Sequence, residues 1–220
     1  MHKYLQRFVV VVSRTHGDCC SLSHIVIFVD IFIGTPQQRV RVIFDTGSSD
    51  VIVQGQGLAC SKDSGGGYGN SACATNRRYK PQASSTFQKA THSFNLKYQA
   101  GKVSGAGGTD TIHFGGYEVE WVRFGELTSE SKNIQQMRAD GVLGLAFTGL
   151  SKITRPPLLA SLFEQHEDDV QNMFSVYISK GLRHDHKSKL IVGGCVCRNF
   201  CIRSDEEEIL SQASFLKCVT

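Results

Sequence analysis

The feature that most constrains the fold of this chain is the segment Phe44–Ser49, in which a short polar turn separates two apolar runs. Val42-Ile43 lie directly before this segment, and the apolar run Val51–Val53 follows it. Short apolar runs that are bounded by turn residues are typical of buried strands. We therefore expect Asp45 to stand on a tight turn at the end of a buried strand.

The composition favours a β-rich protein. The chain has 220 residues, of which 40% are hydrophobic and 20% charged, and this suffices for one or two compact domains. Its 22 glycines against four prolines indicate many turns and hairpins. No apolar run approaches the roughly 18 residues of a membrane span. The net charge of +4 comes from mostly scattered basic residues, so we expect no nucleic-acid partner.

The first 24 residues form an atypical N-terminal segment. The apolar run Phe8–Val12 follows Lys3 and Arg7 and resembles the core of a signal peptide. It is shorter than the usual ~7–15 residues. We prefer an ordinary strand or a misassigned start to a weak or damaged secretion signal, and therefore expect no convincing signal peptide in this chain.

Eight cysteines are many for a cytosolic protein of this size. Cys60 and Cys73 flank a glycine-rich loop and look like a disulfide that closes it, which points to an oxidising compartment. Two free buried thiols are the alternative. The other cysteines lie in terminal groups, at Cys19, Cys20, Cys195, Cys197, Cys201 and Cys218. Because no paired C-x-x-C motif accompanies them, we expect no metal site.

Apolar and alternating runs predict a series of strands. They are Ile25–Ile33, Arg39–Phe44, Phe94–Tyr98, Thr111–Phe114, Tyr117–Val122, Phe174–Ile178 and Lys189–Val192. Gly34–Gln38 should be the turn of a hairpin that presents Asp45. We expect a loop over residues 55–76 and a glycine-spaced turn over Gln99–Gly108.

Two further signals concern a hairpin and a helix. Gly115-Gly116 is expected to be a two-residue hairpin turn, because glycine supplies the positive φ angles that such turns need. Pro156-Pro157 should open the one convincing helix. Its apolar face would consist of Leu158, Leu159, Leu162 and Phe163.

The chemistry that Asp45 could perform is peptide-bond hydrolysis. One carboxylate must deprotonate a water molecule while a second, protonated carboxyl polarises the carbonyl group. Two carboxyls that share a site do not easily both ionise, so one of them keeps a proton. Gly47 would permit close backbone approach, Thr46 could hydrogen-bond to a partner turn, and Ser48 could orient the carboxylate. From the triplet alone, an aspartate that caps its own turn is the alternative.

The segment 25–194 resembles the N-terminal lobe of pepsin-like aspartic proteases. Five blocks match in order, namely Ile33–Gln38, Ile43–Ser49, Tyr98–Gly105 with Gly108–Thr111, Asp140–Phe147, and Phe174–Ser179 with Gly193-Gly194. The resemblance implies a mainly β lobe, barrel-like or sandwich-like, with one short α-helix. It also implies an aspartic endopeptidase of the secretory pathway, extracellular or vacuolar/lysosomal, that acts on peptides or proteins and needs no cofactor.

The resemblance assigns roles to individual residues. Asp45 would be a catalytic aspartate, supported by Thr46, Gly47 and Ser48. Tyr98 and Gly101 would belong to a flap that closes over the substrate. A half-buried strand aromatic is the alternative for Tyr98.

The resemblance also implies packing and pairing. Val142–Gly144 would pack under Asp45, and Cys60 would pair with Cys73. This chain departs from the family at Ile52, where a tryptophan is common.

The resemblance covers only one lobe of a two-lobed enzyme. After Gly194 it stops, and residues 195–220 form a divergent tail that is rich in cysteine and acidic residues. No second Asp-Thr-Gly or Asp-Ser-Gly follows an apolar strand, so we expect the C-terminal lobe to be absent. Three interpretations follow: a truncated protease, a half-enzyme that is active as a homodimer, or an inactive lobe that binds peptides or a partner.

Overall fold

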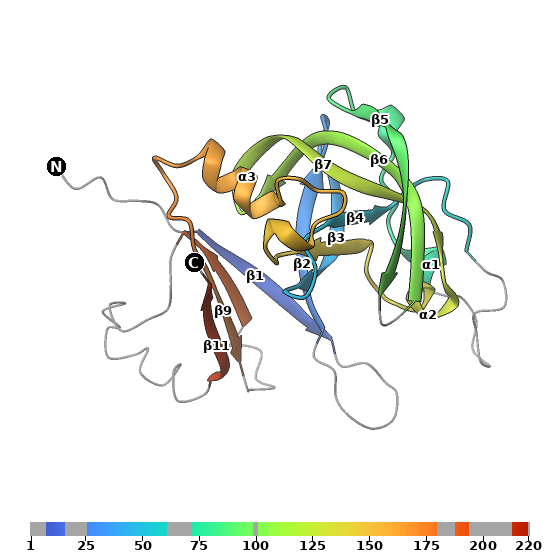
Figure 1. The fold of residues 1–220 in the computed structure, drawn as a ribbon. Helices are drawn as coiled ribbons and strands as arrows, with labels where there is room; N and C mark the ends of the chain where they lie inside the picture. Colours follow the sequence, from blue (N-terminus) through green and yellow to red (C-terminus); the bar gives the residue numbers. More distant parts are fainter. Residues whose placement is uncertain are drawn as a thin grey trace, which may run out of the picture. The chain divides into compact units, whose positions relative to one another are not determined.

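The computed structural model describes residues 8–15, 26–60, 72–98, 101–179, 188–193 and 213–219 (Figure 1). They fall into two compact units, residues 30–162 and residues 1–29 with 163–220. The sequence-based interpretations of Cys19-Cys20, of the flap residues 99–100 and of Cys195–Cys201 lie outside the described residues.

The unit of residues 30–162 is built around a closed sheet. Its strands are β2 (Val26–Ile33), β3 (Gln38–Asp45), β4 (Val51–Gln54), β5 (Gln88–Tyr98), β6 (Gly101–Phe114), β7 (Tyr117–Glu130) and β8 (Gly141–Gly144). They are hydrogen-bonded in the order β2-β3-β8-β4-β7-β6-β5. An additional pairing of β2 with β6, through Ile33 and Ile112, closes the first six into a barrel. The predicted mainly β, barrel-like lobe is confirmed.

The prediction of a turn over Gln99–Gly108 is wrong, because β6 runs unbroken from Gly101 to Phe114. Its glycines serve close packing rather than turning. A Cβ atom on Gly105 would lie 1.9 Å from the backbone oxygen of Glu126 on the neighbouring β7. The glycine-rich run therefore marks the close approach of two barrel strands and not a turn. Gly115 and Gly116 do form the predicted turn, with φ of 62° and 90°.

The helices are short. They are α1 (Ala72–Thr75), α2 (Lys132–Gln135) and α3 (Leu158–Gln165), with 3₁₀ turns at η1 (Pro81–Ala83) and η2 (Thr148–Leu150). The helix predicted after Pro157 is confirmed as α3. The prediction of a loop over residues 55–76 is wrong at Ala72–Thr75, which form α1 and include Cys73. Cys73 is disulfide-bonded to Cys60, so the predicted pairing is confirmed.

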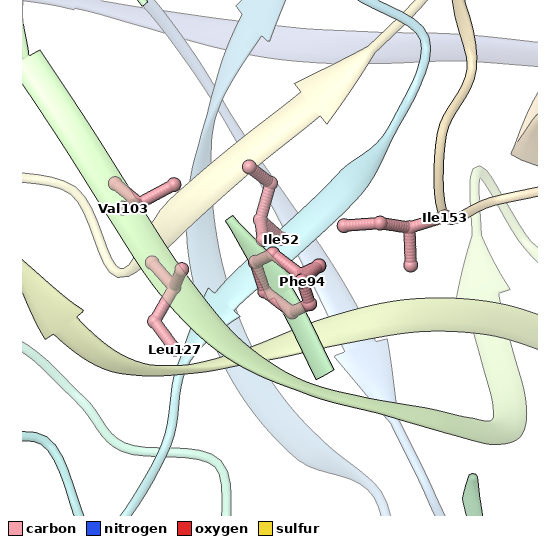
Figure 2. Packing of buried hydrophobic residues seen from close by; sticks show 5 residues of the cluster. All are labelled: Ile52, Phe94, Val103, Leu127 and Ile153. Carbon is pink, nitrogen blue, oxygen red and sulfur yellow. The ribbon is translucent and has the colours of Figure 1, made fainter. Parts of the chain in front are cut away.

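The core inside this unit gathers around Ile52, the residue that stands where the family commonly has tryptophan. Figure 2 shows Ile52 and Phe94 between Val103 and Leu127 on one side and Ile153 on the other. Ile52 is 1% exposed. Tyr98, from the predicted flap, packs against this cluster. An apolar side chain at position 52 thus supports the flap strand by packing.

The second unit contains a small antiparallel sheet. Its strands β1 (Phe8–Thr15), β9 (Phe174–Ser179), β10 (Ser188–Val192) and β11 (Ala213–Val219) lie in the order β11-β9-β10-β1. The preferred interpretation of Phe8–Val12 as an ordinary strand is confirmed by β1. None of the helices within the described residues has the length and apolar character for crossing a membrane.

Candidate active site

Asp45 ends β3, and the turn that follows holds its carboxylate at two points. The backbone N–H of Gly47 donates to Oδ1 at 2.9 Å, and the Ser48 hydroxyl donates to Oδ2 at 2.6 Å. The side chain is half-buried, while Thr46 and Gly47 are exposed. Two hydrogen bonds to one carboxylate fix its orientation. The expectation that Ser48 orients Asp45 agrees with this geometry.

The backbone of the Asp45 turn rests on β8. Asp45 pairs with Gly144 in a parallel register, and the N–H of Leu145 donates to the Asp45 carbonyl at 2.8 Å. A Cβ atom on Gly144 would lie 2.6 Å from the backbone nitrogen of Asp50, so only glycine fits there. The prediction that Val142–Gly144 pack under Asp45 is confirmed.

Asp50, five residues after Asp45, is a structural anchor that sequence reasoning did not identify. It is 4% exposed. Its Oδ1 accepts hydrogen bonds from the Ser151 hydroxyl at 2.8 Å and from the backbone N–H groups of Lys152, Ile153 and Thr154 at 2.8 to 3.0 Å. With its acceptors occupied by this loop, Asp50 is not free to act as a second catalytic carboxylate.

Asp45 borders a cavity of about 170 Å³ within the unit of residues 30–162. Most of its lining is apolar and comes from Ile43, Ile52, Val103, Leu127, Ile134, Met137, Ala139, Gly141 and Val142. Its polar residues are Asp45, Gln54, Tyr98 and Glu130. The predicted catalytic and flap side chains therefore meet at one cavity.

Burial and the nearby carboxylates of Asp50 and Asp45 raise the pKa of Tyr98 well above its ordinary value. Its phenol stays protonated and remains a hydrogen-bond donor at any working pH. Tyr98 pairs with Gly101 at the end of the β5–β6 hairpin. Gly101 has a φ of 151°, which favours glycine, and a Cβ atom there would also lie 1.8 Å from the Ser131 hydroxyl.

Gln54 and Glu130 are polar residues of the cavity that sequence reasoning missed. Gln54 Nε2 donates to both Glu130 carboxylate oxygens, at 3.0 and 3.1 Å. Burial raises the pKa of Glu130, and the Gln54 hydrogen bond and the Arg78 charge oppose that rise. The available signal was a polar residue at the end of the otherwise apolar strand Val51–Gln54.

Comparison with known proteins identifies the family. The model of the eukaryotic aspartyl protease family matches residues 27–204. The chain belongs to this family. It is 34% identical to cathepsin E-B of Xenopus laevis over 168 residues. The aligned region is 76% of this chain and 40% of that protein.

Other members of the eukaryotic aspartyl protease family give the same result. Pepsin A of Gallus gallus is 36% identical over 151 residues, which is 68% of this chain and 38% of that protein. Chymosin of Callithrix jacchus is 34% identical over 168 residues, which is 76% of this chain and 40% of that protein. The chain thus spans about 40% of the length of these relatives, in the region of one lobe.

Proposed function

We propose that this chain is the lobe of an aspartic endopeptidase that supplies one catalytic carboxylate, Asp45. The observation that carries the proposal is the Asp45 turn, which fixes both carboxylate oxygens at the edge of an apolar cavity that Tyr98 also lines. Membership of the family of eukaryotic aspartyl proteases supports the same activity. The substrate would be a peptide or protein.

In the proposed mechanism, a water molecule bound between Asp45 and a second carboxyl attacks the peptide carbonyl. One carboxylate removes the water proton, and the other carboxyl, which is protonated, donates to the carbonyl oxygen. No covalent intermediate forms. Because one of the two carboxyls must stay protonated, we expect an acidic optimum. Closure of the hairpin that carries Tyr98 and Gly101 would exclude bulk water.

The second carboxyl would come from a second lobe or from another copy of this chain. Two features of the Asp45 surroundings support such a partner. Thr46 and Gly47 are exposed on the turn itself. Phe147 and Leu150 are 70% and 61% exposed, and the Phe147 carbonyl accepts a hydrogen bond of 2.7 Å from Ser49 beside the turn. Exposed apolar side chains beside a half-site are what a partner lobe would cover.

We also propose that the protein works in the secretory pathway, in an extracellular or a vacuolar/lysosomal setting. The Cys60–Cys73 disulfide supports this location, because such bridges persist in oxidising compartments.

The test is peptide hydrolysis at about pH 4 with a library of quenched fluorescent peptides. The chain is assayed alone across a concentration series, and also co-expressed with the C-terminal lobe of Xenopus laevis cathepsin E-B, while sedimentation reports its association state. Asp45→Asn removes the proposed catalytic carboxylate. Asp169→Asn makes the same chemical change at an exposed turn and serves as the control.

Hydrolysis that Asp45→Asn abolishes and Asp169→Asn retains is the expected result. Activity of the chain alone that rises with dimer concentration would identify a second copy as the partner, whereas activity only in the co-expressed pair would identify a second lobe. Peptide affinity that survives Asp45→Asn, with no hydrolysis in either format, would overturn the proposal in favour of an inactive peptide-binding lobe.

A further inference from the structure

The β5–β6 hairpin and the end of β7 form a three-stranded layer, one face of which points to the core. Leu96 on β5 packs against the buried cluster of Figure 2, and Val103 on β6 belongs to it. The Glu130 side chain on β7 is hydrogen-bonded to the buried Gln54. Because successive side chains of a strand point to opposite faces of the sheet, the residues that flank these three lie on the other face. They are Asn95, Lys97, Lys102, Ser104, Ser129 and Ser131.

These six residues form the outer face of the layer, and the strand register aligns them in rows. Lys97 lies directly opposite Lys102, and Ser104 lies directly opposite Ser129. The Ser131 N–H donates to the Lys102 carbonyl at 2.9 Å, and the Lys102 N–H donates to the Ser131 hydroxyl at 3.2 Å. A hydroxyl that accepts a hydrogen bond keeps its own proton to donate. Two lysines and three hydroxyl residues are therefore brought together on one face.

The charge of the outer face has one sign. None of its six residues is acidic. The ion pairs recorded among the described residues do not involve Lys97 or Lys102. Like charges that lie directly opposite each other in a sheet are destabilising. An anion bound between the two ammonium groups would relieve this repulsion.

All six residues of the outer face line a hollow of about 590 Å³. Glu130 is the one acidic residue of its described lining, and the Glu130 carboxylate is engaged by Gln54 on the core side. The volume lies within the ~300–1,000 Å³ that is typical of small-molecule sites. The hollow is therefore large enough for an anionic group together with the organic molecule that carries it.

We propose that this hollow is a binding site for a phosphate monoester. At pH 7 such a group carries a charge of about −1.5 to −2 and has three strong acceptor oxygens. Lys97 and Lys102 match the charge, and the hydroxyl groups of Ser104, Ser129 and Ser131 donate to the oxygens. The proposal goes beyond the proposed peptidase activity and does not rest on it, because it uses none of the residues to which that activity is assigned.

A sulfate monoester is the informative competitor, because it has the same tetrahedral shape and a single negative charge. Phenyl phosphate and phenyl sulfate share one organic group, so a difference between them reports the charge. We expect phenyl phosphate to bind about three- to tenfold more tightly. The ratio is modest because exposed charge pairs contribute little.

The test titrates phenyl phosphate, phenyl sulfate and inorganic phosphate into the full chain at about pH 7 and low salt, where charges are least screened. Dissociation constants are taken from the backbone NMR signals of Lys97, Lys102 and Ser129. Lys97→Gln and Lys102→Gln each remove one charge. Lys89→Gln is the matched control, because Lys89 is an exposed lysine of the same strand β5 and is not among the residues that line the hollow.

Phenyl phosphate binding that Lys97→Gln and Lys102→Gln each weaken about three- to tenfold, and Lys89→Gln leaves unchanged, supports the site. Inorganic phosphate that binds as tightly would also support it and identify the free ion as a ligand, whereas weaker binding of the free ion identifies the ester. No binding of phenyl phosphate, or equal binding of phenyl sulfate, overturns the proposal. Equal weakening in all three variants also overturns it, because it would reflect net charge alone.

This result is independent of the hydrolysis test. Asp45→Asn should retain phenyl phosphate binding, since Asp45 is not among the residues that line the hollow. A chain that cleaves peptides but binds no phenyl phosphate would refute the phosphate site alone. A chain that binds phenyl phosphate, yet hydrolyses no peptide alone or with a second lobe, would refute the proposed activity alone.

Discussion

Two buried carboxylates on neighbouring strands differ in how many residues donate hydrogen bonds to them. Asp110 on β6 is 1% exposed and accepts hydrogen bonds from the Tyr79 hydroxyl at 2.6 Å, the Thr86 hydroxyl at 2.5 Å and the Thr111 N–H at 2.8 Å. Glu130 on β7 is 9% exposed and accepts from Gln54 alone among the described contacts of its carboxylate.

The two carboxylates therefore differ in how completely the polar atoms around them are hydrogen-bonded. The Asp110 cluster is closed, because its carboxylate is buried and three donors converge on it. Gln54 and Glu130 are among the residues that line a cavity, and the buried Gln54 Oε1 has no hydrogen-bond partner among the described residues. Fully satisfied buried networks specify a fold, whereas an unpaired buried polar group costs stability.

The largest effect is expected for Asp110→Ala. It would remove the acceptor that the hydroxyl of Tyr79, a residue that is 0% exposed, and the buried backbone N–H of Thr111 use. We expect a loss of about 3–5 kcal/mol in the free energy of unfolding. Glu130→Ala strands only the Gln54 amide and should cost about 1–3 kcal/mol. Urea unfolding of both variants at one pH measures the two losses, and equal losses would contradict the comparison.

Tyr79→Phe should produce the next largest effect. The variant keeps the ring and its edge-on contact with Phe124, whose centroid lies 5.2 Å away, and removes only the hydroxyl that donates to Asp110. Asp110 would lose one of its three donors, at a cost of about 1–2 kcal/mol. Combining Tyr79→Phe with Asp110→Ala gives a double-mutant cycle. Strict additivity in that cycle would show that the two groups are not coupled.

Glu130→Gln should have a small effect on the free energy of unfolding at low pH and a larger effect on how that free energy changes with pH. Burial raises the pKa of Glu130 in the folded state, so the carboxyl's contribution is fully present below its unfolded value of 4.5 and is lost as the pH rises through the folded value. Gln54 and the Arg78 charge limit that loss. Relative to the wild type, the variant should therefore gain stability between about pH 4 and pH 7. Thermal unfolding across this range measures the trend, and a constant difference would refute it.

The sequence predicted the elements whose signals are local. The strand before Asp45, the Gly115-Gly116 turn and the helix after Pro157 depend on neighbouring residues, and the structure confirms them. The family resemblance supplied the Cys60–Cys73 pairing. These features need no knowledge of which strands become neighbours.

The failures depend on contacts between distant segments. Glycines 105, 107 and 108 were assigned to a turn because their pairing with β7 and β5 was unknown. Gln54 and Glu130 lie 76 residues apart, so the cavity lining they share could not be inferred from either neighbourhood. Asp50 could not be distinguished from a turn aspartate without the loop at residues 151–154.

The smallest effect is expected for Asp30→Asn, a third carboxylate that extends the comparison to the surface. Arg41 Nε approaches Asp30 Oδ1 at 3.2 Å, and Arg39 donates to Oδ2. Partial burial raises the pKa of Asp30, but the two arginines lower it more, so the net pKa is below the ordinary value of 3.8.

The sign of the pH dependence is therefore opposite to that of Glu130. The Asp30 contribution is present above its unfolded pKa and is lost as the pH falls through the folded value. The stability lost in Asp30→Asn should shrink on acidification, whereas the difference at Glu130 grows on neutralisation. It should also fade at about 1 M salt, where the screening length is roughly 3 Å. The same thermal series with and without salt measures both trends. A loss that persisted at high salt would place Asp30 with the closed Asp110 cluster, because only a desolvated pair escapes screening.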